Sequence, residues 1–109
     1  ETHYDNKLSV NEEIIIKNHL LMPIDKKLVF TGNKENISLT EKEVSILIEL
    51  IQSKKVISKE KLLTEVWGYS SQINTTTVET HIHRIRQKLK KFSNSRIVIE
   101  TKRGGYSIS

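Results

Sequence analysis

The segment 74–91 combines one apolar stripe with a dense set of hydrogen-bond donors and cations. Its apolar residues recur at intervals of four, three and four, which predicts a helix with one buried face formed by Val78, Ile82, Ile85 and Leu89. At about 100° per residue, the nearly opposite face carries Thr76, Thr80, His83 and Gln87, with Arg84 and Lys91 a little to one side. The flanks carry Arg86, Lys88 and Lys90. A donor face with basic flanks is typical of a helix that reads base edges in the major groove of DNA, although a solvated surface helix shows the same pattern.

Two neighbouring features favour the nucleic-acid interpretation. The first turn of the helix, capped by Asn74 or Thr75, offers free N–H groups beside the hydroxyls of Thr76 and Thr77, a combination suited to a phosphate. A hairpin is predicted over 96–109, because apolar residues alternate on both sides of a glycine-containing turn. Its tip reads Thr101-Lys102-Arg103-Gly104-Gly105-Tyr106. The two cations at this tip are placed to reach a neighbouring groove, with Tyr106 supporting them by packing or by a phosphate hydrogen bond.

The positive charge is concentrated in the same part of the chain. The formal net charge of the 109 residues is +5. Residues 67–109 carry eight Lys or Arg against two Asp or Glu, whereas the rest of the chain is balanced to within one charge. Such asymmetry suits a polyanionic partner, because neutralised phosphates release counterions.

Other chemistry finds little support in the sequence. The chain has no cysteine, which excludes disulfides and thiolate zinc sites. His81 and His83 are two residues apart on the predicted helix and point away from each other, so they do not chelate one metal. No hydrolase or metalloprotease motif occurs, and we expect neither catalysis nor a cofactor. Aromatic residues amount to 6 %, which disfavours single-stranded RNA. No apolar run approaches a membrane span and no signal peptide is evident, so we expect a cytoplasmic protein without membrane contact.

The elements around the helix predict an α+β domain over 12–109. Apolar bursts within 12–39 predict three or four short antiparallel strands. The helical part spans 40–91. It begins with a capping box, Thr40 with Glu43, and a helix near 41–53. After the extended link Val56-Ile57 come a short helix at about 59–66, the loop 69–73 and the long helix 75–91. Residues 1–11 are interpreted as a linker or tag remnant.

The motifs along this layout resemble those of the OmpR/PhoB-type winged-helix effector domain. The resemblance covers roughly residues 39–109. It rests on the segments Leu39-Thr40-Glu41-Lys42-Glu43, Ile57-Ser58-Lys59-Glu60-Lys61-Leu62-Leu63, Val66-Trp67-Gly68, Thr77 through Leu89, and Ile99 through Tyr106. It implies a winged helix-turn-helix with an N-terminal antiparallel sheet, three helices and a C-terminal wing hairpin. The recognition helix would be 75–91 and the wing tip 101–106.

The resemblance also implies partners and roles. The domain would be the output half of a two-component response regulator, preceded by a receiver domain, and would bind direct repeats of double-stranded DNA as a dimer. The loop 68–74 would contact RNA polymerase. DNA contacts would come from the recognition helix, the wing and the second helix, namely His81, His83, Arg84, Arg86, Thr101, Arg103, Lys59 and Trp67. Each of two lone residues also has a simpler explanation than a DNA contact. Lys59 fits a solvated surface position, and Trp67 fits packing in the core.

From these contacts we predict which side chains read bases and which only position the DNA backbone. Arg84 and His83 would read base edges, with Thr80 against a thymine methyl group or a hydrogen-bonding edge. Arg86, Lys88, Lys59 and Arg103 would mainly position the backbone. The sequence departs from the family pattern at Thr76, where an Arg is usual, at Thr80 and His83, and in a wing shorter by one residue. The rival hypothesis is a winged-helix module for protein contact, which would need an exposed apolar patch that the outward helix face lacks.

Overall fold

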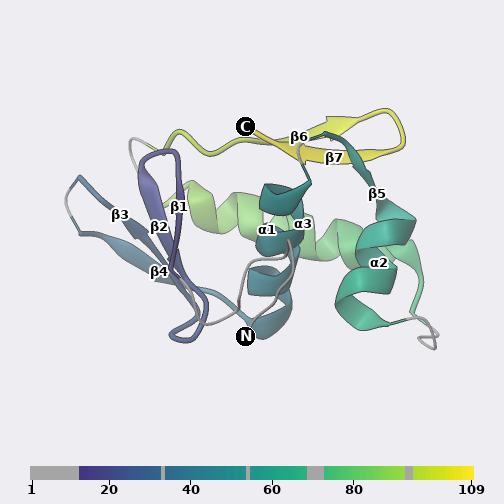
Figure 1. Cartoon of the computed structure of the whole chain (residues 1–109), viewed down its shortest axis with the longest axis horizontal. Helices are drawn as coiled ribbons and strands as arrows, with labels where there is room; N and C mark the ends of the chain where they lie inside the picture. Colours follow the sequence, from purple (N-terminus) through teal and green to yellow (C-terminus); the bar gives the residue numbers. More distant parts are fainter. Residues whose placement is uncertain (1–12, 33, 54, 69–72, 93–94) are drawn as a thin grey trace, which may run out of the picture.

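The four-stranded N-terminal sheet forms one end of the molecule (Figure 1). The computed structural model describes residues 13–32, 34–53, 55–68, 73–92 and 95–109, so the predicted linker 1–11 lies outside them. Strands β1 (Ile14–Ile16), β2 (His19–Met22), β3 (Lys27–Phe30) and β4 (Asn36–Ser38) are antiparallel in sequence order. One cross-strand row, Ile14, Leu21, Leu28 and Ile37, is buried. The prediction of three or four short strands is confirmed.

Helix α1 (Glu41–Gln52) packs beside this sheet and begins where the sequence places it. The Thr40 hydroxyl accepts a hydrogen bond from the Glu43 N–H at 3.2 Å, and Glu43 Oε1 accepts one from the Thr40 N–H at 2.9 Å. This reciprocal pair is the predicted capping box, which satisfies two N–H groups that a helix start leaves free. The helix buries Val44, Ile46, Leu47, Ile48 and Leu50.

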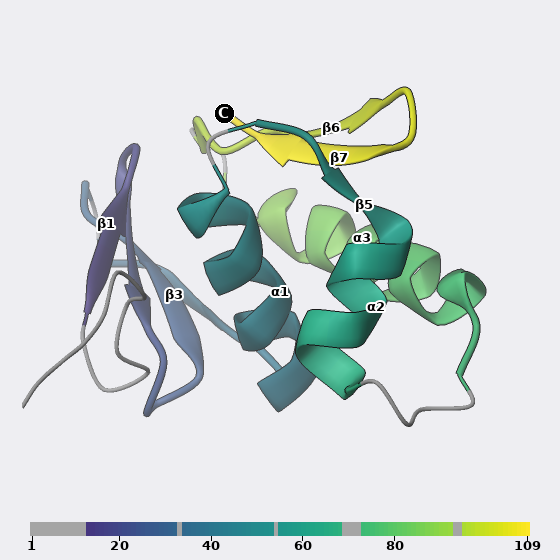
Figure 2. The same cartoon turned by 45° about the vertical axis from the view of Figure 1, so that its right-hand side comes forward.

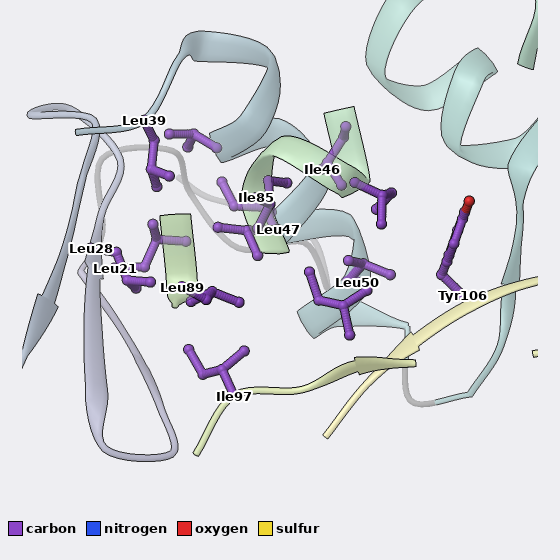
Figure 3. Close-up of a cluster of buried hydrophobic side chains, with 14 of the residues drawn as sticks. Leu21, Leu28, Leu39, Ile46, Leu47, Leu50, Ile85, Leu89, Ile97 and Tyr106 are labelled. Atoms are coloured by element: carbon purple, nitrogen blue, oxygen red, sulfur yellow. The ribbon is translucent and has the colours of Figure 1, made fainter. Parts of the chain in front are cut away.

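Helices α2 (Lys59–Trp67) and α3 (Thr75–Leu89) complete the helical layer, with α1 between the sheet and α2 (Figure 2). Ser58 caps α2 by accepting from the Lys61 N–H at 3.0 Å. Asn74 caps α3 by accepting from the Thr76 N–H at 3.0 Å. The third helix ends at Leu89, two residues before the predicted limit. Side chains from the sheet, α1, α3 and the wing meet in one core (Figure 3).

The C-terminal hairpin is part of a three-stranded sheet rather than a free arm. Strands β6 (Ile99–Lys102) and β7 (Gly105–Ile108) form the predicted hairpin, and β5 (Ile57–Ser58) adds to β7. The predicted extended link at Val56-Ile57 is thus a strand that anchors the wing. Gly105 permits this pairing, because a Cβ atom there would lie 2.0 Å from the Ile57 carbonyl oxygen.

Candidate nucleic-acid interface

Helix α3 presents one buried and one exposed face, as its sequence periodicity predicts. Val78, Ile82 and Ile85 are at most 1 % exposed, and Leu89 is 7 % exposed. The polar residues of the opposite side are exposed, namely Thr76, Thr80, His83, Arg84 and Gln87. The apolar stripe therefore fixes the helix on the core and leaves the donor face in solvent.

The exposed face of α3 contains one cation without an internal partner. The Arg84 side chain makes no hydrogen bond or ion pair with the part of the chain that the structure describes. Gln87 Nε2 lies 3.5 Å from His83 Nε2. The Thr80 hydroxyl donates to the Thr76 carbonyl at 3.0 Å, and the Thr80 side chain is exposed. These side chains offer donors, acceptors and a methyl group to a surface in contact with the helix.

Arg86 faces the wing. Its Nε and Nη2 atoms donate to the Ile99 carbonyl oxygen at 3.1 and 2.6 Å, and Nη2 also donates to the Thr101 hydroxyl at 2.9 Å. From the sequence, Arg86 is predicted to position the DNA backbone. In the structure the hydrogen-bonding edge of its guanidinium is engaged within the protein.

Lys88 also differs from its expected role. Its ammonium group lies 2.5 Å from Glu43 Oε1, and the Glu43 side chain is only 1 % exposed. The same carboxylate oxygen caps α1, so Lys88 ties the end of α3 to the start of α1. A lysine held by a buried carboxylate is a poor phosphate contact, because the carboxylate would lose its counter-charge. The expectation overlooked this pair because the two residues lie 45 positions apart.

Lys59 pairs with the acidic residue of α3. Its ammonium donates to Glu79 Oε2 at 2.9 Å, and both side chains are partly exposed. The hydrogen bond that Lys59 donates to Glu79 raises the pKa of Lys59, and the neighbouring negative charges add to this effect. The pair offsets the negative charge of Glu79 on α3, and the open side of Lys59 stays accessible to solvent.

Trp67 and His81 contact each other at the junction of α2 and α3. Their ring centroids are 5.0 Å apart in an edge-on arrangement. His81 Nδ1 donates to the Thr77 carbonyl oxygen at 2.8 Å, so its Nε2 atom is the free ring nitrogen. The Lys42 ammonium lies 5.7 Å from the Trp67 ring centroid and donates to the Val66 carbonyl oxygen at 3.3 Å. Trp67 is therefore packed and half-buried, and its expected contact with DNA stays a prediction.

The wing tip places cations in solvent and its tyrosine in the core. Thr101, Lys102 and Arg103 are exposed, and Gly104 adopts a positive φ of 85° in the two-residue turn. Lys102 forms a surface ion pair with Glu100 at 3.2 Å, whereas Arg103 has no such partner among the described residues. Tyr106 is 4 % exposed. Its ring supports the wing by packing, and a phosphate contact through its hydroxyl stays a prediction.

One prediction falls mostly outside the residues that the structure describes. Most of the loop 68–74, the expected RNA polymerase contact, is not among the described residues. Within them, no helix is both long and apolar enough to span a bilayer. No group of three potential metal-ligating side chains occurs in the same described ranges.

Comparison with known proteins identifies the family. The family model for the C-terminal domain of transcriptional regulatory proteins matches residues 33–108. The chain is 37 % identical over 94 residues to the transcriptional regulatory protein ResD of Bacillus subtilis, covering 85 % of this chain and 39 % of ResD. It is 40 % identical over 80 residues to the response regulator ArlR of Staphylococcus aureus, covering 72 % of this chain and 36 % of ArlR. The chain thus spans about two fifths of the length of these relatives.

A solved structure supports the same assignment. The DNA-binding domain of Bacillus subtilis CssR superposes with a TM-score of 0.70 and 26 % identity, covering 84 % of this chain and 99 % of that domain. In this chain the superposed fold consists of the N-terminal antiparallel sheet, three helices and the C-terminal hairpin. The chain belongs to the family of C-terminal domains of transcriptional regulatory proteins, the OmpR/PhoB-type winged-helix DNA-binding domains.

Proposed function

We propose that this domain binds double-stranded DNA sequence-specifically as the output domain of a two-component response regulator. Helix α3 would lie in the major groove and the wing tip would contact the adjacent groove. The observation that carries the proposal is the outward face of α3, where Arg84 projects into solvent with no partner among the described side chains. A free guanidinium on the exposed side of a helix matches the acceptor pair on the major-groove edge of guanine.

The free side chains supply base readout in this proposal. Arg84 would donate to guanine, while His83 and Gln87 would contact adjacent base edges. The methyl group of Thr80 would contact a thymine methyl group. The Thr76 hydroxyl would bind a phosphate near the positive end of the helix dipole, since the Thr76 N–H is already taken by Asn74.

Backbone contacts would come from a smaller set of cations than the sequence indicates. Arg103 and Lys102 would reach phosphates from the wing, and Lys59 would do so beside Glu79. Lys88 would act inside the protein through Glu43. Trp67 and His81 would set the position of α2 against α3, and the Nε2 atom of His81 would be available as a hydrogen-bond acceptor.

The roles of the whole protein extend the proposal further. ArlR is a response regulator, so a receiver domain is proposed to precede this domain in the full protein. Two copies would bind direct repeats, and the loop 68–74 would contact RNA polymerase. The protein would act in the cytoplasm, by binding rather than by catalysis.

The competing function is a winged-helix module that contacts another protein through α3. Fluorescence anisotropy distinguishes the two, using a random duplex and a duplex selected from a library, at about 50 and 200 mM salt. We expect tighter binding to the selected duplex and an affinity that falls steeply with salt, with a logarithmic slope of about −0.9 per neutralised phosphate. Weak binding to both duplexes that is insensitive to salt would favour the protein-contact module.

A further inference from the structure

Arg86 joins the recognition helix to both strands of the wing hairpin. Its guanidinium donates to the Ile99 carbonyl and the Thr101 hydroxyl, both on β6, at distances of 2.6 to 3.1 Å. The guanidinium carbon also lies 5.7 Å from the ring centroid of Tyr106 on β7, in cation–π range. No other side chain of α3 has hydrogen bonds to the wing within the described ranges.

The Ile99 carbonyl needs this donor because β6 is an edge strand. The order β5-β7-β6 leaves one side of β6 without a neighbouring strand. Val98 and Ser109 exchange both backbone hydrogen bonds, at 3.0 and 2.9 Å. In an antiparallel ladder the next pair, Ile99 with Ile108, therefore directs its N–H and C=O groups away from its partner. The Ile99 carbonyl points to the open edge, and Arg86 satisfies it there.

We infer that Arg86 is a positioning residue, which fixes the wing against α3 so that both reach DNA in one register. The inference rests on the proposed function, because it specifies how the two DNA-contacting elements are held together. A planar guanidinium can hold two acceptors at once and stack on a ring, whereas a lysine ammonium is a point charge. Arg86 then acts on DNA through the wing tip rather than by touching a phosphate.

The charge-preserving variant Arg86→Lys tests this role in a cycle with Arg103→Ala. Alone, Arg86→Lys should weaken binding to the selected duplex about tenfold, because the wing loses its fixed position. In the Arg103→Ala background the same change should cost less than about twofold, since the contact through which Arg86 acts is already gone. Arg84→Ala is the matched control. Its fold-loss in affinity should multiply with that of Arg103→Ala, because the two side chains act independently. Retained affinity in Arg86→Lys, or effects that multiply in the cycle, would overturn the inference.

A second measurement needs no DNA. Amide hydrogen exchange of the free domain should be about tenfold faster in residues 99–107 of Arg86→Lys, with the amides of α1 unchanged. Unchanged exchange in the wing, or equal acceleration in α1, would contradict the role of Arg86. If the wild-type domain fails to bind DNA, the proposed function is lost, yet this exchange result still decides whether Arg86 holds the wing.

Discussion

The ion pair between Lys88 on α3 and Glu43 on α1 leads to a prediction that separates an internal role from a DNA contact. Lys88→Ala should lower the stability of the domain and leave the salt dependence of its DNA binding unchanged. Removing one partner of a buried ion pair costs about 3–5 kcal/mol. Here the Lys88 side chain is 27 % exposed, and Glu43 keeps its hydrogen bond from the Thr40 N–H. We therefore expect a loss of about 2 kcal/mol.

Urea and thermal unfolding followed by circular dichroism measure this loss. For a domain of this size, about 2 kcal/mol corresponds to a fall in Tm of roughly 8–16 °C. Lys90→Ala is the matched control, because Lys90 lies two residues further on with an exposed side chain. The double variant Glu43→Gln/Lys88→Met should recover part of the loss, since it leaves no unpaired buried charge.

The opposite pattern would refute this reasoning. Two results together would show that Lys88 neutralises a phosphate. The free energy of unfolding of Lys88→Ala would lie within about 0.5 kcal/mol of the wild type, and the slope of log affinity against log salt concentration would become shallower by about 0.9. The sequence interpretation of Lys88 as a backbone contact would then be correct.

Three other substitutions test separate parts of the structure. Arg84→Ala should cost about 1–3 kcal/mol on the selected duplex and relax base preference at one position; equal weakening on random duplexes would make Arg84 a phosphate contact. Gly105→Ala should separate β5 from β7 and lower Tm by several degrees, because its Cβ would lie 2.0 Å from the Ile57 carbonyl oxygen; an unchanged Tm would argue against this packing. Burial lowers the pKa of His19 from 6.5. The native state then resists protonation while the unfolded state accepts it, so stability should fall from about pH 7.5 to 5.5, and less so in His19→Phe. An equal fall in both proteins would exclude His19 as the cause.

Local features of the fold could be predicted from the sequence. The spacing of Val78, Ile82, Ile85 and Leu89 places one face of α3 on the core, and the structure buries all four. The capping box at Thr40 is likewise readable, because its two members are three residues apart. Helical periodicity and helix caps depend on residues that are close in the sequence, so they can be predicted without the fold.

Contacts between distant segments could not be predicted in this way. Arg86, Lys88 and Arg84 share one helix and look alike as basic residues, yet only the fold brings an acceptor to two of them. His19 has no partner in the sequence pattern, whereas the structure places its Nε2 atom 2.8 Å from the Ser95 hydroxyl, between Phe30 and Phe92. Such partners depend on packing between elements. For this reason the sequence indicates the interface and overestimates the number of its free cations.

Methylation interference on the selected duplex tests the central claim most directly. Dimethyl sulfate methylates guanine at N7, in the major groove, and adenine at N3, in the minor groove, so each modification reports on one groove. If α3 lies in the major groove, N7 methylation of guanines within the site should weaken binding, and Arg84→Ala should lose that sensitivity at one guanine. Binding that is indifferent to guanine methylation throughout the site, or sensitive only to adenine N3, would contradict the placement of α3 in the major groove.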